Sequence, residues 1–489
     1  MNMEIDHLIN FFRLHQDFDK DIHLLVSNCH TWELLHRLIQ ENSGLDIHIY
    51  CLSRQLKKDL RKRLCEPLPL ASVNNISFEE VETLEAHDHV GTLVFDGSVD
   101  EERLVQLSRL NPDAVVGLSQ GTNVSYLKLW EAFRECSRYF YLRYQLTNTK
   151  MEVFDWVKGE HDIELSVIFP VYNVAKYLDQ CIQSVTAWKA PYVEYLFVND
   201  GSPDNSREII LRYAKKDPRV KLIDKPNGGC ASARQKGLEQ AKGRYIGFID
   251  PDDFIEPDMF KQLLGRAMLG SYEVCYCGYN EYYESTNTVK PMPDALDDPF
   301  AWGTVDLMYI QKLIMHQRVA IWRGIYRRDL IDRAHIEFQT NLRRFDDLPF
   351  KVEICANARS VVALKQYLYY YRLDRPGQDV SCNDERLYVH FDIFKHLDKV
   401  FAKLDDRRLF DYLQVCKVQT HAYALQKIQE KFVDEYARQA REDLSHNVDK
   451  HRTVMCLKRW VGGNGKDAYL SIMNGKASAY KSKLPSSKK

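Results

Sequence analysis

Two apolar runs in the middle of the chain end in acidic residues, and this pattern strongly constrains the fold. The first run, residues 195–198, is followed by Asp200. The second, residues 243–249, is followed by three carboxylates within four residues, Asp250, Asp252 and Asp253. Carboxylates this close repel one another, so the cluster is tolerable where a cation or sugar hydroxyls fill the space between them. Strand ends with exposed carboxylates are where an open α/β sheet binds its ligand.

The residues around these runs alternate between strand and helix patterns. Apolar runs predict strands at residues 165–170, 195–198, 220–223 and 245–250. Between them we expect one helix capped by Asn173 and two more at residues 206–216 and 231–241. Short connections in such an alternation are typical of a doubly wound sheet, which we predict for residues 163–285. The polar, proline-containing stretch 284–304 is predicted to be a long loop.

The first 150 residues predict a separate, smaller α/β domain of Rossmann-like type. Strand patterns occur at residues 23–27, 46–52, 89–95 and 114–118, with helical stretches such as 31–41 and 101–110 between them. No G-x-G-x-x-G motif follows the first strand, so a dinucleotide or methyl-donor site is not supported. A scaffold or partner-binding role is favoured over a second active site. The polar residues 150–162 are expected to be the linker.

The C-terminal part predicts a helical region, residues 381–450, followed by a basic tail, residues 451–489. Apolar residues step by three or four from Leu387 to Leu404, which is the spacing of a helix. The tail is rich in lysine and arginine and contains one acid, Asp467. Two interpretations stay open: contact with anionic lipid through Leu457 and Trp460, or a disordered solubilising end.

Composition excludes several classes of protein. A chain of 489 residues exceeds one ordinary domain, so two or three are expected. The formal net charge of -2 gives no general attraction to nucleic acid. No run approaches the ~18 apolar residues of a spanning helix, and the N-terminus lacks a signal-peptide core. The twelve scattered cysteines fit no zinc or redox motif, and we interpret them as buried reduced thiols of a cytoplasmic protein.

Five motifs follow one another in the central part of the chain, at residues 166–173, 198–202, 227–237, 243–253 and 344–350. In order and spacing they resemble the motifs of the family-2 glycosyltransferases, inverting enzymes with the A-type fold that mostly build bacterial surface polysaccharides. One such motif is weak, but five in order are specific. The resemblance covers about residues 163–380, which we expect to be the catalytic domain. The chain departs from the family at Asp346, where a glutamate is common.

The resemblance implies a nucleotide-sugar donor, with UDP as the expected nucleotide. Tyr172, two residues after Pro170, would stack on the uracil ring. Asp200 would accept a hydrogen bond from a ring N–H of the base; the alternative is a turn aspartate before Gly201. Arg234 would contact the base or pair with Asp200, and its alternative is a surface arginine.

The resemblance also implies a divalent metal at the aspartate cluster. Asp252 is the expected direct ligand, with Asp250 and Asp253 sharing contacts to the ribose and to metal-bound water. Hard cations such as Mg²⁺ or Mn²⁺ suit these oxygen ligands and would stabilise the departing diphosphate. The alternative is a turn that caps the helix near Pro257, although turn chemistry alone rarely needs three acids.

The second acid pair, Asp346 and Asp347, supplies the expected catalytic base. The family pattern favours Asp347 as the group that removes the acceptor's proton in an inverting single displacement. The alternative for both acids is an exposed helix N-terminus, where the helix dipole favours carboxylates. Arg372 and Arg375, after a strand-like run, are weaker candidates for diphosphate or acceptor contacts.

The sequence therefore predicts a metal-dependent inverting glycosyltransferase that moves a sugar from a UDP-sugar to a hydroxyl of a bacterial surface glycan such as lipopolysaccharide, capsule or a teichoic-type polymer. We expect it in the cytoplasm or at the inner face of the membrane. One alternative is a nucleotidyl or other nucleotide-sugar enzyme, which would need a basic phosphate signature near the first strand. Another is a non-catalytic sugar-binding or assembly protein on the same fold.

Overall fold

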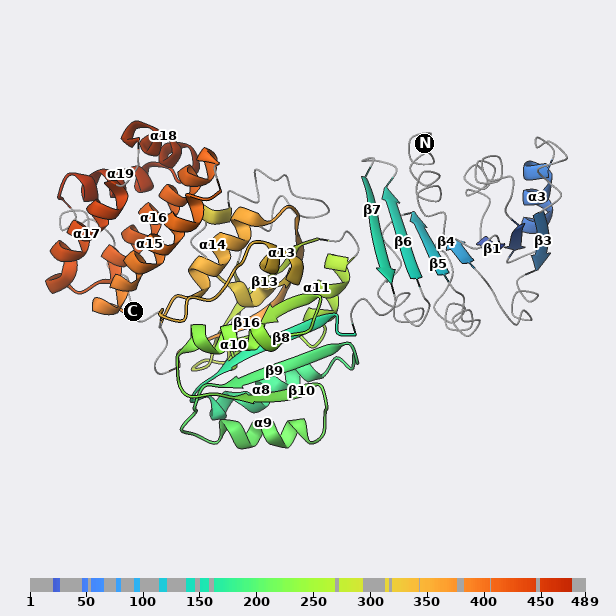
Figure 1. The fold of residues 1–489 in the computed structure, drawn as a ribbon, viewed down its shortest axis with the longest axis horizontal. Coiled ribbons are helices and arrows are strands. Elements are labelled where there is room, and N and C mark those ends of the chain that lie inside the picture. The colour runs from blue at the N-terminus through green and yellow to red at the C-terminus, as the bar shows by residue number, and fades with distance from the viewer. Residues whose placement is uncertain are drawn as a thin grey trace. The chain divides into compact units, whose positions relative to one another are not determined.

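A computed structural model of the chain describes residues 162–268, 272–292, 313–315, 319–342, 344–375, 382–404, 406–445 and 449–476. Before residue 162 it describes a set of strands and one helix. The chain divides into two compact units, Met1–His161 with Met268–Ser271, and Asp162–Ala267 with Tyr272–Lys489 (Figure 1). The finer division into four parts at residues 150, 163, 380 and 450 stays a prediction.

The described strands of the first unit form one sheet in the order β3-β2-β1-β4-β5-β6-β7. Their bounds are β1 Asp21–Val26, β2 Asp46–Cys51, β3 Ile76–Glu80, β4 Thr92–Asp96, β5 Ala114–Gln120, β6 Arg138–Gln145 and β7 Lys150–Val157, and the described helix is α3 Arg54–Cys65. All neighbours pair in parallel except β6 and β7. The four strands predicted from sequence are confirmed to within a few residues. The helices predicted at 31–41 and 101–110 lie outside the described residues.

The predicted linker 150–162 is wrong in its first half, because Lys150–Val157 is strand β7. Each of its residues is paired with a residue of β6 in one antiparallel ladder. Polar and apolar residues alternate from Lys150 to Val153, and this two-residue period is typical of a strand. Polarity alone was therefore a misleading signal for a linker here.

The second unit is built on a larger mixed sheet in the order β10-β9-β8-β11-β15-β13-β16-β12, with β14 paired to β13. The strands are β8 Leu165–Val171, β9 Val193–Asn199, β10 Val220–Asp224, β11 Tyr245–Phe248, β12 Phe254–Ile255, β13 Val274–Tyr283, β14 Thr288–Met292, β15 Gly324–Arg327 and β16 Val361–Leu373. Strands β10, β9, β8 and β11 are parallel to one another, and β15 runs antiparallel between β11 and β13. The doubly wound arrangement predicted for this half is confirmed.

Helices connect and cover these strands. They are α8 Ala175–Thr186, α9 Ser206–Ala214, α10 Cys230–Gln240, α11 Met259–Met268, α13 Arg328–Arg333 and α14 Asp347–Asn357. Strands β8 and β9 are almost completely buried, as expected of apolar strands covered on both faces. Helix α10 lies unusually close to β8, because a Cβ atom at Gly237 would be 2.4 Å from Cγ2 of Ile168.

Two local predictions in this unit are corrected. Asn173 does not cap α8: it has a left-handed φ of 55°, and the amide of Ala175 instead donates to Oδ2 of Asp204 at 2.8 Å. The long loop predicted at 284–304 begins with a hairpin, since Thr288–Met292 forms β14 on the edge of β13. Residues 293–304 lie outside the described part.

The C-terminal region is a helical bundle, which confirms the helical prediction (Figure 1). Its helices are α15 Val389–Phe401, α16 Arg407–Lys427, α17 Val433–Ser445, α18 Lys450–Trp460 and α19 Gly463–Met473. The last two helices correct the interpretation of a disordered end as far as Met473. Leu457 is completely buried, and the ring of Trp460, which is partly exposed, packs 5.0 Å from that of Tyr412. Leu457 is therefore not available as a lipid anchor, and contact of the tail with lipid stays a prediction.

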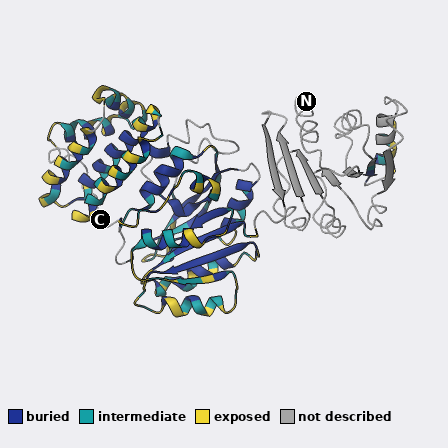
Figure 2. Cartoon of the chain, viewed as in Figure 1, coloured by how far each residue is buried: buried dark blue, intermediate teal, exposed yellow. Residues whose placement is uncertain are grey.

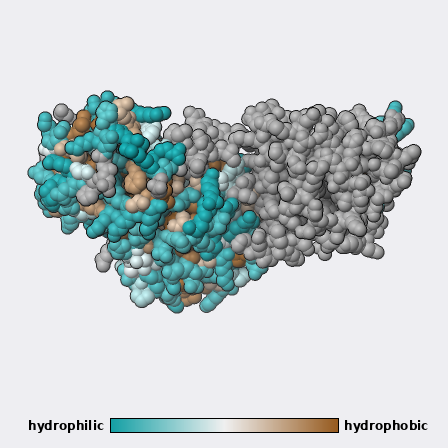
Figure 3. Space-filling view, turned by 45° about the horizontal axis from the view of Figure 1, so that its top comes forward, coloured by the Kyte–Doolittle hydropathy of each residue, from teal (hydrophilic) through white to brown (hydrophobic). Residues whose placement is uncertain are grey.

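The described residues on the face drawn in Figure 3 are mostly hydrophilic, and buried residues concentrate in the sheet and in the bundle helices (Figure 2). The large apolar side chains exposed among the described residues are Tyr172, Val289, Phe410 and Met455. A search of the described helices finds none with the length and apolar character needed to cross a bilayer.

Truncation of Leu457 provides a test of the folded tail. We expect Leu457→Ala to lower the free energy of unfolding by about 2–5 kcal/mol, because it leaves a cavity in a packed core. Urea unfolding of the full chain measures this. Met455→Ala on the same helix is the matched control and should change stability by less than about 0.5 kcal/mol, because Met455 is 53% exposed. Equal, small effects at both positions would mean that α18 does not pack as described.

Candidate active site

The carboxyl ends of three neighbouring strands bring the predicted donor residues to one edge of the sheet. In the order β9-β8-β11, strand β9 ends before Asp200, β8 ends before Tyr172, and β11 ends before Asp250. Because these strands are parallel, the loops that follow them meet on the same side. The structure thus brings together residues spread over eighty positions of sequence.

Asp200 is the centre of a small hydrogen-bonded cradle. Its Oδ1 accepts from Nζ of Lys225 at 2.5 Å and from the amide of Gly228 at 2.9 Å, and its Oδ2 accepts from the amide of Gly229 at 2.7 Å. Gly229 has a φ of 89°, a backbone conformation that favours glycine. The buried carboxylate therefore fixes the loop before α10. Each carboxylate oxygen has two lone pairs, so a further donor can still be accepted.

Tyr172 is 51% exposed at the end of β8. Large aromatic side chains in this unit are otherwise mostly buried, and eight tyrosines of the described chain are nearly inaccessible. The next residue, Asn173, donates its amide to Oγ of Ser202 in the β9–α9 connection at 3.2 Å. This contact holds the backbone next to Tyr172 beside the loop that carries Asp200.

The three clustered aspartates have three different partners. Oδ1 of Asp250 accepts from Arg234 at 2.6 Å, while Asp252 is ion-paired with Arg375. Asp253 accepts from the hydroxyl of Tyr369 at 2.7 Å through Oδ2, and Oδ1 accepts a backbone amide of β16 at 2.8 Å. Asp253 thus connects the cluster to β16, whereas Asp250 and Asp252 pair with the long side chains of two arginines.

Burial makes this cluster electrostatically unfavourable. It raises the pKa of Asp252 to about 6, although Arg375 acts to lower it and Asp250 raises it further. Burial and the charges of Asp252 and Asp250 also raise the pKa of Asp253. A cation between these groups would relieve both the repulsion and the desolvation cost.

Arg234 joins the aspartate cluster to the second acid pair. Its side chain is only 5% exposed, which excludes the surface-arginine alternative. One terminal nitrogen donates to Asp250, and the other donates to Oδ2 of Asp346 at 2.9 Å. It does not pair with Asp200, whose cationic partner is Lys225. Residues 234, 250 and 346, far apart in sequence, therefore form one connected group.

Asp346 and Asp347 stand where α14 begins, as the helix N-terminus alternative also expects. The preceding residue, Phe345, has a left-handed φ of 55°, a strained conformation of the kind that clusters at functional sites. Burial raises the pKa of Asp347 to about 7, against the lowering effect of Arg234 and with further increases from Asp346 and Asp250. A carboxyl group that titrates near neutrality is suited to proton transfer.

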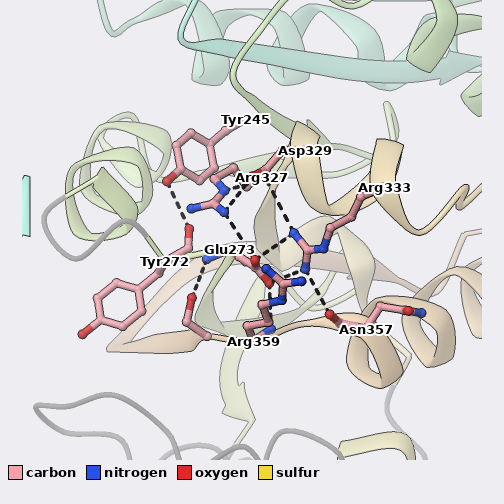
Figure 4. Close-up of polar contacts among 9 residues, drawn as sticks. Tyr245, Tyr272, Glu273, Arg327, Asp329, Arg333, Asn357 and Arg359 are labelled. Carbon is pink, nitrogen blue, oxygen red and sulfur yellow. Dashed lines mark hydrogen bonds and ion pairs between the residues drawn. The ribbon is translucent and has the colours of Figure 1, made fainter. Parts of the chain in front are cut away.

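The far end of α14 is anchored by a buried ion cluster, which Figure 4 shows. Glu273, the residue before β13, is paired with Arg333 at 2.8 Å and with Arg327 at 3.3 Å. Arg333 also donates to the carbonyl of Asn357, the last residue of α14, and Glu273 accepts the amide of Arg359 at 2.7 Å. Because these contacts fix the helix end to the sheet, they help to hold its acidic first turn in place.

The two arginines predicted to contact the diphosphate or the acceptor, Arg372 and Arg375, differ in how accessible they are to a ligand. Arg372 is buried among the rings of Tyr177, Phe254 and Tyr282, and it donates to the carbonyl of Asp252 at 2.7 Å. These contacts favour a structural role over phosphate binding. Arg375 is partly exposed and forms an ion pair with Asp252.

The chemistry of the donor set fits a divalent metal bound together with a diphosphate. No group of three metal-ligating side chains is arranged around a common point in the described residues. Asp250 and Asp252 nevertheless offer two carboxylates, and Mg²⁺ is commonly held by one or two carboxylates plus substrate phosphates and water. Asp253 is the least suited of the three, since both of its oxygens accept hydrogen bonds.

Sequence reasoning missed Lys225 and Tyr369. Lys225 directly follows β10, so the rule that ligands meet at strand ends could have identified it. Tyr369 lies in a run of tyrosines, and nothing in that run distinguishes the residue that bonds to Asp253 from its neighbours.

A mixed sheet with acids at its carboxyl edge, joined through one arginine to a second acid pair, is the arrangement that the sequence predicts for a glycosyltransferase. The Glycosyl transferase family 2 model matches residues 166–331. Uncharacterized glycosyltransferase YibD of Escherichia coli is 31% identical over 254 residues, which are 50% of this chain and 73% of that protein. The chain belongs to glycosyltransferase family 2.

Other relatives agree with this assignment. Uncharacterized glycosyltransferase EpsJ of Bacillus subtilis is 35% identical over 210 residues, which are 42% of this chain and 60% of EpsJ. Among solved structures, residues 1–349 of S. aureus TarS match with a TM-score of 0.53 at 19% identity, covering 65% of this chain and 91% of that one. This likeness concerns the fold, and it corresponds to the A-type arrangement predicted from sequence.

Proposed function

We propose that this glycosyltransferase uses a UDP-sugar as donor and a hydroxyl of a bacterial surface glycan as acceptor, with a divalent metal and with inversion at the anomeric carbon. The observation that carries the proposal is the double pairing of Arg234 with Asp250 and Asp346. It connects the expected metal and diphosphate site to the expected base through a single buried side chain. Both halves of a sugar transfer are thereby held in one rigid group.

The UDP-sugar donor is supported by the cradle around Asp200 and by the exposed ring of Tyr172. A stacked ring and a carboxylate facing a ring N–H would together recognise uracil. The solved TarS fragment that shares this fold has been obtained in complex with UDP-GlcNAc. Minor teichoic acid biosynthesis protein GgaB of Bacillus subtilis, 28% identical over 44% of this chain, supports a surface glycan as acceptor, although the chain spans 23% of that protein.

The proposed mechanism is a single displacement. The acceptor oxygen attacks the anomeric carbon as the bond from that carbon to the diphosphate oxygen breaks, and the acceptor proton passes to the Asp347 carboxylate. Asp250 and Asp252 would hold Mg²⁺ or Mn²⁺, which would neutralise the leaving diphosphate. Asp346, which accepts a hydrogen bond from Arg234, would act as a positioning group beside Asp347.

An assay of released products with a panel of UDP-sugars, Mn²⁺ and candidate glycan acceptors tests this function. The proposal expects UDP and a glycosylated acceptor. A nucleotidyl enzyme would instead release pyrophosphate, and a non-catalytic sugar-binding protein would bind UDP without releasing any product. Either of these two results would overturn the proposed activity.

We expect the first unit to be dispensable for donor binding. The predicted donor residues all belong to the unit that starts at Asp162, so a chain that begins there should bind UDP with affinity close to that of the full chain. Its activity on a glycan acceptor is expected to fall if the first unit selects acceptors or partners. Calorimetry in Mn²⁺ measures the UDP affinity of the shortened chain and of the full chain. A shortened chain that melts cooperatively yet cannot bind UDP would assign part of the donor site to residues 1–161.

The expected cytoplasmic location is a proposal that rests on the cysteines. Nine cysteines in the described part of the chain are free thiols, and most of them are buried. This agrees with the interpretation of reduced thiols from sequence. Contact with the inner face of the membrane is a weaker proposal, since Leu457, one of the two expected anchors, is buried in the bundle.

A further inference from the structure

The contact between Asp252 and Arg375 lies at the point where the proposed metal and the proposed diphosphate would meet. The Asp252 side chain is 7% exposed, and one of its oxygens faces a terminal nitrogen of Arg375. Asp252 is also the expected direct metal ligand. A guanidinium and a divalent cation at this oxygen would repel each other, so the two compete for Asp252.

The backbone turns after β16, and this turn brings Arg375 to Asp252. Strand β16 ends at Leu373, after its Arg372 amide has bonded to Asp253. The next residue, Asp374, has a left-handed φ of 65° and accepts from Oγ of Ser285 at 2.5 Å. Aspartate tolerates this conformation better than most residues, but it remains uncommon. The turn is thus braced, while the Arg375 side chain beyond it is partly exposed.

Arg375 is incompletely satisfied in its present position. Its Nε is buried and donates no hydrogen bond within the described residues. An arginine side chain presents five N–H donors in a planar fork, and a diphosphate can accept two or more of them at once. The contact with the Asp252 carboxylate through one terminal nitrogen therefore uses fewer of the N–H donors of Arg375 than a bound diphosphate would.

We propose that Arg375 exchanges partners during donor binding: it neutralises Asp252 in the ligand-free protein and moves to the donor diphosphate when a metal ion takes Asp252. This inference rests on the proposed function and adds a coupling mechanism to it. Metal alone must displace Arg375 without offering it a new partner, so it binds weakly. Metal and nucleotide together provide both partners, so each strengthens the binding of the other, as linkage requires.

The test measures Mn²⁺ binding without nucleotide, and UDP binding with EDTA and with saturating Mn²⁺, by calorimetry on the full chain. In the unchanged protein we expect Mn²⁺ to tighten UDP by about 5- to 150-fold, the usual range of such couplings. Arg375→Met should bind Mn²⁺ alone roughly tenfold more tightly, because a charge-assisted contact no longer competes. The same variant should bind UDP in Mn²⁺ more weakly than the unchanged protein.

Two further variants make the result specific. Arg375→Lys keeps the charge but loses the fork, so it should still compete with Mn²⁺ while binding UDP less well. Arg207→Met is the matched control, because Arg207 pairs with Asp224 at an exposed position and should change none of the three affinities. Melting curves verify that each variant folds. If Arg375→Met does not fold, the UDP affinity of Arg375→Lys tests the proposal by itself.

The outcomes separate this inference from the function on which it rests. If the unchanged protein binds UDP with Mn²⁺ but Arg375→Met binds Mn²⁺ no more tightly, the exchange is overturned and the donor site stands. Unchanged UDP affinity in both Arg375 variants would overturn it equally. If the unchanged protein does not bind UDP under any condition, the proposed function itself fails.

Discussion

Asp347→Asn is expected to remove most sugar transfer while leaving UDP affinity near that of the unchanged protein. A base acts on the acceptor hydroxyl in the transition state and scarcely touches the bound donor, so its loss appears in turnover. General-base contributions are typically ~10²–10⁴-fold. Steady-state kinetics with saturating donor measures the loss, and an unchanged melting temperature excludes a folding defect.

Asp346→Asn is the control for this variant, and we expect it to lower activity less. Asp346 accepts a hydrogen bond from the buried Arg234, so we assign it a positioning role. An inactive Asp346→Asn beside a fully active Asp347→Asn would reverse the two roles. In that case the aspartate that replaces the family's common glutamate would be the residue that reaches the acceptor.

The raised pKa of Asp347 also predicts how the rate of sugar transfer depends on pH. Since burial raises its pKa to about 7, the carboxylate that a base requires forms only as the pH rises through that value. The rate of transfer should therefore increase with pH up to about 7 and then level off, and this rise should be absent from the residual activity of Asp347→Asn.

Asp252→Asn should lose the dependence of donor binding on metal. An amide is a poor ligand for a hard cation compared with a carboxylate, so UDP should bind equally weakly with Mn²⁺ and with EDTA. The expected loss is the whole coupling factor, about 5- to 150-fold in UDP affinity with Mn²⁺ present. Calorimetric titration of UDP measures it.

Asp253→Asn is the comparison that separates metal binding from support of the site. Both Asp253 oxygens bond to β16, so its loss should lower the melting temperature more than it lowers the effect of Mn²⁺. If Asp252→Asn retains the full effect of Mn²⁺ while Asp253→Asn loses it, the metal ligand has been assigned to the wrong aspartate.

Features that depend on near neighbours in sequence were predictable. Continuous apolar runs identified β8, β9 and β11, because strands buried on both faces need them. The acids that follow these strands were predicted to meet, because parallel strands end on one side of the sheet. The tail helices could also have been found: Gly465, Ala468, Tyr469 and Ile472 are buried at helical spacing, but the basic composition obscured them.

Contacts between distant segments could not be predicted from the sequence. The cap on α8 comes from Asp204, twenty-nine positions beyond the amide that it accepts. The partner of Asp253 comes from Tyr369, and the partner of Asp252 from Arg375. Each depends on how β16 lies in the sheet, and its parallel pairing with β13 leaves no local signal. The same reason explains why Arg372 looked available in sequence yet is enclosed by three aromatic rings.

Calorimetric titration of UDP into the full chain, with Mn²⁺ and again with EDTA, tests the central claim most directly. The cradle around Asp200 and the carboxylates of Asp250 and Asp252 predict saturable binding that is clearly tighter with Mn²⁺. The same UDP affinity in Mn²⁺ and in EDTA, or no binding in either, would contradict the proposal of a metal-assisted UDP-sugar site at the carboxyl edge of this sheet.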